Sequence, residues 1–431
     1  MKISACIIAK NEEKNLPRLL KSIKDKFDEI ILVDTGSTDK TIDIAKNFSC
    51  KVFQKDWKGF ADARNFAVSK ATGDWIWHFD ADFELENSQY QKAVFFLKNI
   101  PQSYDAVMIG VKNFDKNGIV TTYSSQIFIH RNKPNIKWVG KVHEYINVDV
   151  SYGIPVFVNH YGYQDNEILY KKAQRNLKLL EEEIKTLERD SQEYLFKLFY
   201  IVQSYVVFFS TKKSDSTLYK KVEKYINEYL NIKQTFHKGR GITIFDNHIF
   251  SYALTVYISQ KEFKKAKQML EHQLIKDSSY PDIVYYRILV ENHYKNYKEL
   301  VEQIINFVEI LDKAKKNLFL NGENKVIESA NKINQILNLL QEPLSKLDTV
   351  TKESFEKKAL QIFKATKGEN SGLVLYKILK SLKKDHQAKT LLKKLSRLSN
   401  DKLSTLRVAV EMVKEGEKEQ AKKILQTIHK V

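Results

Sequence analysis

Three carboxylates follow one apolar run in the first hundred residues. Asp80, Asp82 and Glu84 come directly after "WIWHF", a run typical of a buried strand. Like charges that share a site repel one another and lose hydration, so the cluster costs free energy unless a cation or hydrogen-bond donors compensate. The D-x-D spacing offers oxygen ligands to Mg²⁺ or Mn²⁺, which take further ligands from a diphosphate. The alternative is a solvated acidic turn, since the motif is short and common.

Two other predicted strands also end in polar residues. "IIAKNEE" leads into Asn11 and Glu12, and "IILVDTGSTDKT" leads into Asp34 and then Ser37. Ligands of open α/β sheets bind outside the carboxyl ends of the strands, so these ends point towards one crevice. For Ser37 and Thr38 the alternative is a helix N-cap. Asp34, at the strand end itself, is the better candidate for a ligand contact.

Further candidates lie near a predicted helix start and in a later β-rich stretch. "ADARNFA" carries Arg64 and Asn65, and an arginine there can bind phosphate through two hydrogen bonds. "IKWVGKVHEYI" offers His143 and Glu144, and "VNHYGY" adds His160. A lone histidine is more often a core or surface residue, and that interpretation stays open for His160.

The elements that must position these residues change in kind along the chain. Up to residue 165, short β-rich runs alternate with helical periods, which predicts an α/β fold with a largely parallel sheet. From residue 166 the pattern is helix after helix. We therefore expect an α/β domain at 1–165, a helical linker or extension at 166–240 and an all-α domain at 241–431. The predicted strands are Ile3–Ile8, Glu29–Val33, Lys51–Phe53, Trp75–Phe79 and Ala106–Val111, and the predicted helices include Asn15–Lys24, Thr38–Asn47 and Glu167–Leu187.

Weak repeats occur in the helical part. Phe263 and Tyr297 lie 34 residues apart in similar segments, and Ala388 and Ala421 lie 33 apart. These spacings are close to the tetratricopeptide period and predict an α-solenoid, with an irregular helical bundle as the alternative. Stacked helix pairs present an extended concave surface, which suits a peptide or a second copy of the chain.

Charge and cysteine content narrow the class of protein. Residues 1–165 carry 22 Lys and Arg against 20 Asp and Glu, so nearly all of the net charge of +18 belongs to residues 166–431. A solvated lysine-rich surface explains this charge, with an acidic partner, nucleic acid or a membrane surface as alternatives. Two cysteines are too few for a disulfide framework, and no stretch reaches the roughly 20 apolar residues of a membrane helix. We expect a cytoplasmic protein with no membrane span and no nucleic-acid partner.

Four segments in order carry a family resemblance. "IIAKNEEKNLPRLLKSI", "DEIILVDTGSTDKT", "ADARNFA" and "GDWIWHFDADFEL" resemble the family 2 glycosyltransferases of the GT-A fold. The resemblance implies an inverting transfer of a sugar from a nucleotide-sugar donor, usually a UDP-sugar, with Mg²⁺ or Mn²⁺ as cofactor. It implies that the donor is bound by Ala9, Asn11, Glu12, Asp34, Ser37, Arg64, Asp80 and Ala81, and the metal by Asp80, Asp82 and His143.

The implied reaction also needs a base. The acceptor attacks from the face opposite the leaving group, where a carboxylate should take its proton. We expect Glu144 to be this base, with Glu84 in reserve, and His143 to contact the metal or the diphosphate.

The later motifs narrow the acceptor. The His143–Glu144 pair, "NHYGY" and "RNLKLLEEEI" resemble bacterial family 2 transferases with an appended tetratricopeptide-like region, among them the SunS type, which glycosylates Cys or Ser of bacteriocin precursor peptides. We expect a hexose, most simply glucose, to be attached to such a peptide, with the helical region holding the peptide or forming a homodimer. One alternative is a lipopolysaccharide-core or cell-wall glycan acceptor. Another is a degenerate transferase that acts as a basic helical-repeat binding protein, although Asp34, Asp80 and Asp82 all stand.

Overall fold

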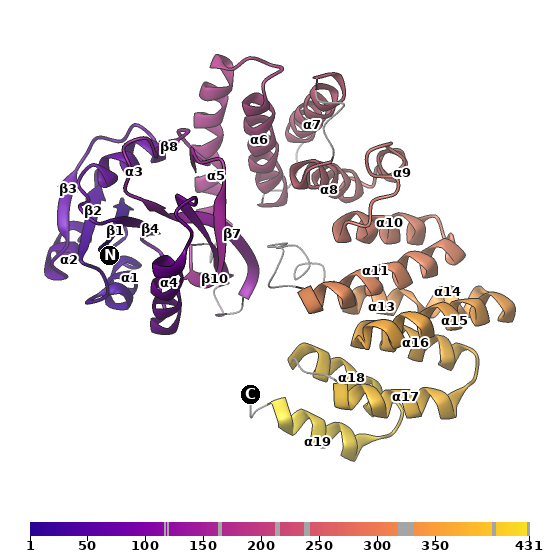
Figure 1. Ribbon diagram of the computed structural model, residues 1–431. Helices are drawn as coiled ribbons and strands as arrows, with labels where there is room; N and C mark the ends of the chain where they lie inside the picture. Colours follow the sequence, from indigo (N-terminus) through magenta and orange to yellow (C-terminus); the bar gives the residue numbers. More distant parts are fainter. Residues whose placement is uncertain are drawn as a thin grey trace. The chain divides into compact units, whose positions relative to one another are not determined.

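The computed structural model describes residues 1–115, 118, 120–162, 166–211, 216–236, 242–317, 332–398 and 402–428. These residues form two compact units, one within residues 1–240 and one within residues 241–431. The first unit contains the described strands together with helices, and the second is helical (Figure 1). The predicted combination of an α/β part followed by an all-α part is confirmed.

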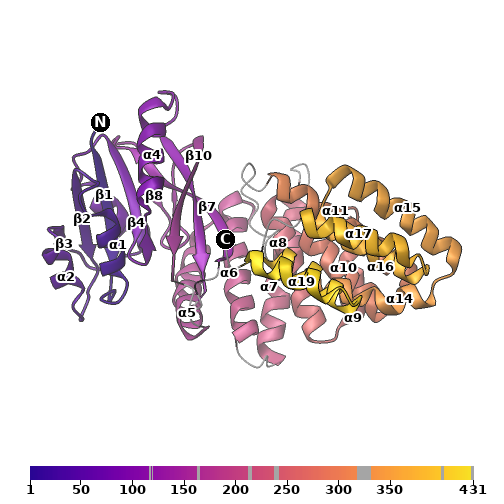
Figure 2. The same cartoon turned by 90° about the horizontal axis from the view of Figure 1, so that it is seen from below.

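The first unit is built on an eight-stranded sheet in the order β3-β2-β1-β4-β7-β6-β10-β5. Neighbours pair in parallel except at β7, which runs antiparallel to β4 and β6, and at β5, which runs antiparallel to β10. Figure 2 shows β1, β2 and β4 side by side. The strands are β1 (Ile3–Ala9), β2 (Glu29–Asp34), β3 (Lys51–Gln54), β4 (Trp75–Asp80), β5 (Phe83–Glu84), β6 (Ala106–Phe114), β7 (Val120–Arg131) and β10 (Ser151–His160), and a separate hairpin pairs β8 (Trp138–Val139) with β9 (Tyr145–Ile146).

Apolar side chains on both faces of the central strands explain why these runs become buried strands. On β1, Ile7 packs into the larger core and its neighbour Cys6 into a smaller core on the other face. Parallel strands covered on both faces read as nearly continuous apolar runs, as β1 does. The larger core includes residues of α1 and α4, and the smaller one residues of α3. The helices are α1 (Leu16–Ile23), α2 (Thr41–Asn47), α3 (Phe60–Val68) and α4 (Asn87–Asn99).

The predicted elements are all present, with small shifts at their ends. Each predicted strand extends one to three residues further, and β6 reaches Phe114. Helix α2 begins at Thr41 instead of Thr38, because Ser37 and Thr38 bond to the loop after β1. The N-capping alternative for these two residues is therefore wrong.

Three long helices after residue 165 belong to the first unit. They are α5 (Asn166–Glu183), which continues into a 3₁₀ turn at Ile184–Thr186, α6 (Gln192–Thr211) and α7 (Ser216–Phe236). Within the described ranges, every helix is too short or too polar to cross a membrane.

The second unit repeats one kind of helix–turn–helix connection. Phe263 and Tyr297 are the first residues of α9 and α11, and Ala388 and Ala421 are the fourth residues of α17 and α19, so the sequence repeats fall at equivalent positions. Each of these four helices begins two residues after a residue in the left-handed region, and the residue between them donates to a carbonyl five positions back, a Schellman turn. The left-handed residues are Lys261, Lys295, Lys383 and Gly416.

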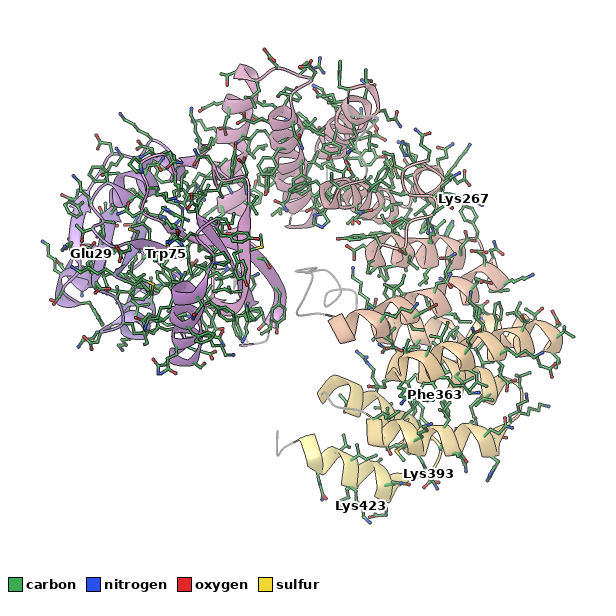
Figure 3. All side chains as sticks on the ribbon, viewed as in Figure 1. Glu29, Trp75, Lys267, Phe363, Lys393 and Lys423 are labelled. Atoms are coloured by element: carbon green, nitrogen blue, oxygen red, sulfur yellow. The ribbon has the colours of Figure 1, made fainter. Side chains whose placement is uncertain are left out.

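The helices of this unit share an apolar core and expose lysines. The core runs from Val284 to Ala421. Lys267, Lys393 and Lys423 lie on exposed helix faces (Figure 3). The described helices are α8 (Ile244–Ser259), α9 (Phe263–Leu270), α10 (Pro281–His293), α11 (Tyr297–Asn317), α13 (Ile333–Leu339), α14 (Gln341–Lys346), α15 (Thr349–Thr366), α16 (Glu369–Ser381), α17 (Asp385–Leu398), α18 (Lys402–Lys414) and α19 (Lys418–Ile428).

Candidate active site

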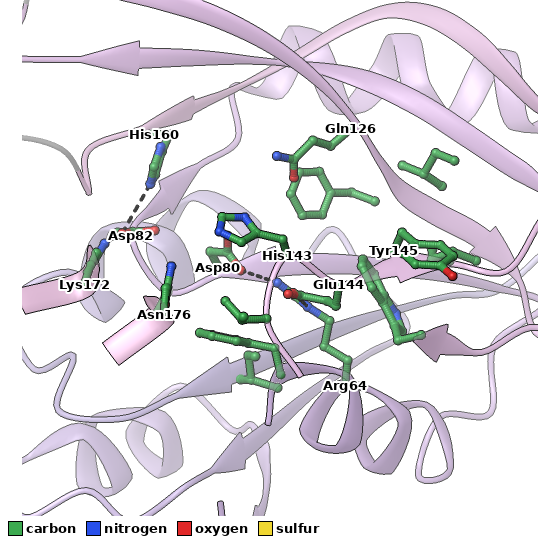
Figure 4. Close-up of a pocket in the computed structure, with 18 of the residues that line it drawn as sticks. Arg64, Asp80, Asp82, Gln126, His143, Glu144, Tyr145, His160, Lys172 and Asn176 are labelled. Carbon is green, nitrogen blue, oxygen red and sulfur yellow. Dashed lines mark hydrogen bonds and ion pairs between the residues drawn. The ribbon is translucent and has the colours of Figure 1, made fainter. Parts of the chain in front are cut away.

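A cavity of about 760 Å³ lies in the first unit at the carboxyl ends of β1 and β4. Its walls come from the ends of these strands, from α3 and β7, from residues 142–146, and from α5 and α6. Figure 4 shows the side chains that line it. The strand ends thus meet at one crevice, as the sequence predicts.

Arg64 joins two carboxylates in this cavity. Its Nη2 lies 2.7 Å from Oδ1 of Asp80, and its Nε lies 2.8 Å from Oε1 of Glu144. The guanidinium is 4% exposed and lies 4.7 Å from the ring centre of Trp138. Burial opposes the charge of Arg64, but Asp80 and Glu144 outweigh it, so the pKa of Arg64 is raised. Arg64 therefore bridges two carboxylates of the cavity.

Asp82 points to another part of the cavity wall, beside His160 (Figure 4). Its Oδ2 lies 3.4 Å from Nε2 of His160 and 3.7 Å from Nζ of Lys172. Burial opposes ionisation of Asp82, but His160 and Lys172 outweigh it and hold the pKa of Asp82 below its ordinary value. Nδ1 of His160 lies 2.6 Å from Oδ1 of Asn113, which accepts its proton, so a ring protonated on both nitrogens donates to Asp82, whereas a neutral ring offers its Nε2 lone pair to a metal.

Asp82 and His160 offer donor atoms of the kinds that a small divalent cation takes. A Cβ built on Gly162 would lie 2.1 Å from Oδ2 of Asp82 and 2.5 Å from Nε2 of His160, so any side chain at this position would clash with both groups. Carboxylate oxygen and imidazole nitrogen suit Mn²⁺, and a carboxylate with phosphate and water suits Mg²⁺. Within the described ranges no three His, Cys, Asp or Glu side chains cluster as metal ligands. Phosphate oxygens of a ligand and water would therefore complete the coordination shell of a cation.

The surroundings of His143 differ from those expected of a metal ligand. Its backbone has φ +50°, and its ring stacks on Tyr200 with centroids 3.6 Å apart. Burial, with the charges of Lys197 and Arg175, lowers the pKa of His143 to about 3. His160, and not His143, lies against Asp82, and Asp80 pairs with Arg64. The pairing of β10 with β5 brings His160, at the end of β10, to Asp82 in place of His143.

The loops after β1 and β2 fasten to each other at the expected nucleotide end. The amide of Asn11 donates to Oγ of Ser37 at 2.9 Å, and Asn11 Oδ1 accepts from the amide of Thr38 at 2.8 Å. The buried carboxylate of Asp34 accepts from the amides of Gly36 and Ser37 at 3.0 and 3.1 Å. Ala9, Glu12 and Ala81 line the cavity, whereas Asn11, Asp34 and Ser37 shape the loops beneath it.

The two candidate bases are separated by the fold. Glu144 lines the cavity with its side chain 11% exposed. Glu84 is not among the lining residues; on β5 it accepts from the hydroxyl of Tyr161 at 2.7 Å and from Asn159 at 3.4 Å. Burial and this carboxylate together raise the pKa of Tyr161 to about 12. The position of Glu84 favours a structural role for it.

Several lining residues were missed from the sequence. Helix α5 contributes Lys172, Arg175 and Asn176, whose spacing of three and four residues places them on one helix face. Arg175 stacks over the ring of Phe60 at 4.9 Å and hydrogen-bonds Asn176, and it forms no ion pair with any described residue. The spacing of these three polar residues is visible in the sequence, but it does not indicate which face of α5 packs towards the cavity. The other missed residues are Trp57, Phe60, Gln126, Trp138, Phe196 and Tyr200.

Residues 4–143 match the model of the family described as Glycosyl transferase family 2. This region is a family 2 glycosyltransferase domain. The match includes Arg64, Asp80 and Asp82 and stops at His143. Glu144, His160 and the lining residues of α5 and α6 lie beyond it.

Two of three similar relatives are named as glycosyltransferases, and the third as a TPR repeat-containing protein. The chain is 32% identical over 203 residues to the glycosyltransferase SunS of Bacillus phage SPbeta, covering 45% of this chain and 47% of SunS. It is 33% identical over 175 residues to a TPR repeat-containing protein of Synechococcus elongatus, covering 37% of this chain and 42% of that protein. An uncharacterized glycosyltransferase of Rickettsia typhi is 46% identical over 84 residues, 20% of this chain and 29% of the relative. The chain spans less than half the length of each.

Two solved structures align more loosely. S. aureus TarS covers 63% of this chain and 55% of that chain at 18% identity and a TM-score of 0.35. Glucosyl-3-phosphoglycerate synthase from Mycobacterium tuberculosis in complex with Mn²⁺ and UDP-glucose covers 27% and 44% at 24% identity and a TM-score of 0.23. With TM-scores below 0.5, neither likeness bears on the function of this chain.

Proposed function

We propose that this protein is a metal-dependent, inverting glycosyltransferase that uses a UDP-sugar, with glucose as the first candidate. The observation that carries the proposal is one cavity in the family 2 domain where Asp82 lies against His160 while Arg64 bridges Asp80 and Glu144. Paired carboxylates with cations beside them suit a diphosphate and a metal on one side and proton transfer on the other.

Two groups of residues would hold the donor. Asp82 and His160 would bind Mg²⁺ or Mn²⁺, which as a Lewis acid stabilises charge on a departing diphosphate. Lys172 and Arg175 on α5 would contact the diphosphate oxygens, since their cations line the same cavity. Ala9 and Glu12 would line the nucleoside pocket, with Asp34 and Ser37 supporting its loops.

Glu144 would act as the base. Arg64 holds one of its oxygens and so fixes the direction of the carboxylate, and the other oxygen would accept the proton of the acceptor.

For the acceptor we propose Ser or Cys of a bacteriocin precursor peptide. The similarity to SunS supports this choice, as does a cavity wall that includes Tyr145, Phe196 and Tyr200, aromatic side chains that can pack on a peptide. The helical second unit would hold the peptide or form a homodimer. An acidic glycan is the second candidate, because residues 166–431 carry most of the net charge of +18.

The donor proposal is tested by UDP-glucose hydrolysis and UDP binding with Mn²⁺ and with EDTA. We expect slow hydrolysis and UDP binding with Mn²⁺, and a loss of both in EDTA and in Asp82→Ala. The matched control is Asp105→Ala, which removes a half-buried carboxylate that pairs with Lys133 and Arg131 outside the cavity. Full hydrolysis in EDTA, or in Asp82→Ala, would count against the assignment.

The acceptor proposal is tested with a panel of acceptors. Ser- and Cys-containing peptides are incubated with UDP-glucose and Mn²⁺ alongside lipopolysaccharide-core and cell-wall glycans, and mass spectrometry reads the products. A hexose on a peptide, abolished by changing its Ser or Cys to Ala, is the expected result. Transfer to a glycan alone would replace the peptide proposal and leave the donor proposal intact.

A further inference from the structure

A lysine of α6 is completely buried beside the cavity. Lys197 has a side-chain exposure of 0%, and its Nζ lies 2.9 Å from Oε2 of Glu183, at the end of α5. The same Nζ lies 3.4 Å from the carbonyl oxygen of Val142, to which it donates. An apolar side chain of similar size would fill the place without the desolvation of two charges, so packing alone does not explain this pair.

The Lys197–Glu183 pair contacts the backbone just before Glu144, the candidate base. Gly140 has φ +97°, and a Cβ built on it would lie 3.1 Å from Nζ of Lys197, so the loop passes directly against the ammonium group. Oε1 of Glu183 accepts the amide of Lys141 at 3.4 Å. The two partners of one ion pair therefore hold the amide of Lys141 and the carbonyl of Val142, which belong to the peptide groups on either side of the 141–142 peptide.

The opposite side of this loop is held by the family 2 domain. The carbonyl of Lys141 accepts the amide of Phe60 at 2.9 Å, at the start of α3. One turn later on α3, Arg64 pairs with Glu144. At the next position after Val142, His143 adopts φ +50°, a conformation that costs free energy for a non-glycine residue, and its ring stacks on Tyr200 of α6. The loop is thus held between α3 and α6 while one of its residues is strained.

We propose that Lys197 and Glu183 are positioning residues, which fix the backbone of residues 140–144 and so aim Glu144 at the acceptor. The assignment rests on the proposed function of Glu144. It makes the helices α5 and α6 a working part of the active site, although they lie outside the residues matched by the family. A buried ammonium that donates to a backbone carbonyl and a carboxylate that accepts a backbone amide are the groups this task requires.

The test compares Lys197→Met, Glu183→Gln and the double variant Lys197→Met with Glu183→Gln. The double variant leaves no uncompensated buried charge, so it separates folding from positioning. Amide hydrogen exchange of residues 138–146 is measured with residues 3–9 of β1 as an internal reference, together with thermal stability, UDP affinity and UDP-glucose hydrolysis. Lys133→Met, which removes an exposed ion pair with Asp105, is the matched control.

We expect the loop amides of both Lys197→Met and the double variant to exchange roughly tenfold faster or more while those of β1 change little. Turnover should fall on the order of 10-fold to 100-fold in both, with UDP affinity within about twofold, because a small misplacement of a catalytic group has effects of this size. Lys197→Arg should recover part of the turnover. The double variant should recover stability without recovering turnover.

Other results would overturn the proposal. If the double variant regained both stability and turnover, or if the loop exchanged as slowly as in the unmodified protein, the pair would serve folding alone. Hydrogen exchange requires no activity, so it tests the positioning role of the Lys197–Glu183 pair even if the unmodified protein hydrolyses no UDP-sugar. An absence of hydrolysis would count against the proposed function, whereas unchanged loop exchange would count against the positioning role.

Discussion

Asp80 and Glu144 share one guanidinium, and this sharing divides the work between the site carboxylates. Arg64 binds one oxygen of each, at 2.7 and 2.8 Å, and its positive charge offsets the repulsion between the two carboxylates. Asp82 is directed instead to His160. Arg64, a permanent cation, therefore compensates Asp80 and Glu144, whereas His160 and Lys172 compensate Asp82.

The base assignment makes a prediction for Glu144→Gln. The change keeps the shape and a hydrogen bond to Arg64 but removes proton acceptance, so turnover should fall by roughly 10² to 10⁴. UDP affinity with Mn²⁺, measured by calorimetry, should stay within about threefold of the unmodified protein. Turnover near the normal rate would move the role of base to another residue. Glu84→Gln serves as the comparison and should retain most activity.

Glu29 makes a prediction about stability and pH. This buried carboxylate, labelled in Figure 3, accepts from Ser4 Oγ at 2.6 Å, from the Thr72 amide at 2.6 Å and from Lys51 Nζ at 2.6 Å. Burial would raise the pKa of Glu29, but these partners outweigh it and lower the pKa from 4.5 to about 2. A lowered folded pKa means that the stabilisation is complete above pH 4.5 and is lost as the pH falls towards 2.

The measurement compares Glu29→Gln with the unmodified protein by urea denaturation. At pH 7 the variant should be less stable by about 2 kcal/mol, because a buried carboxylate with charged and neutral donors is lost. At pH 2.5 the gap should narrow to a fraction of that value, since Glu29 is then partly protonated. An equal gap at both pH values would mean that its charge does not matter. Glu86→Gln, with an exposed side chain, is the control.

At the scale of elements, α5 brings cations to a site that the sheet supplies with carboxylates. Lys172 and Arg175 lie on one face of this helix and line the cavity. The charge of Arg175 is not neutralised by an ion pair with any described residue, and a guanidinium in that situation favours an anion. The same helix ends at Glu183, which holds the loop before Glu144.

The Arg175→Gln variant should distinguish binding of the phosphates of UDP from binding of its nucleoside. We expect UDP to bind roughly 10-fold to 100-fold more weakly, because charge-assisted hydrogen bonds to phosphate are lost, while uridine binding stays the same. Calorimetry with both ligands in Mn²⁺ measures the difference. Arg189→Gln, on a 69% exposed arginine paired with Glu228, is the control. An equal loss for uridine and UDP would indicate a disturbed fold instead of a lost phosphate contact.

At the scale of the whole molecule, two compact units divide near residue 240. The cavity is lined entirely by residues up to Tyr200, and the helical repeats belong to the second unit. Helices α5 and α6 therefore belong to the same compact unit as the family 2 domain, and they contribute residues that line its cavity. In our proposal, donor chemistry takes place in the first unit and acceptor selection depends on the second.

Two shortened chains test this division. A chain of residues 1–240 should fold and bind UDP with Mn²⁺ as the full chain does, but it should lose transfer to the acceptor identified with the panel. A chain of residues 1–165 lacks Lys172, Arg175 and the Lys197–Glu183 pair, and it exposes apolar surface that α5 and α6 cover, so it should aggregate or fail to bind UDP. Normal UDP binding by the shorter chain would contradict the role given to α5.

The sequence by itself determined the fold class, the runs of β1, β2, β3, β4 and β6, and the motifs at the ends of three of these strands. Periodicity and apolar runs are local, and parallel strands must bring their carboxyl ends to one edge, so Asp80 and Asp82 were predictable there. The left-handed turns of the helical repeats were less visible, because three of the four positions carry lysine where glycine is the usual signal.

Tertiary structure alone decided which distant residues complete the site. His160 meets Asp82 because β10 pairs with β5, and Glu84 is drawn away by the same pairing. Lys172 and Arg175 reach the cavity, and Lys197 reaches the loop of residues 140–144 beside it, because α5 and α6 pack against residues that lie more than forty positions earlier in the sequence. Such contacts depend on the packing of whole elements, and no short-range pattern in the sequence specifies them.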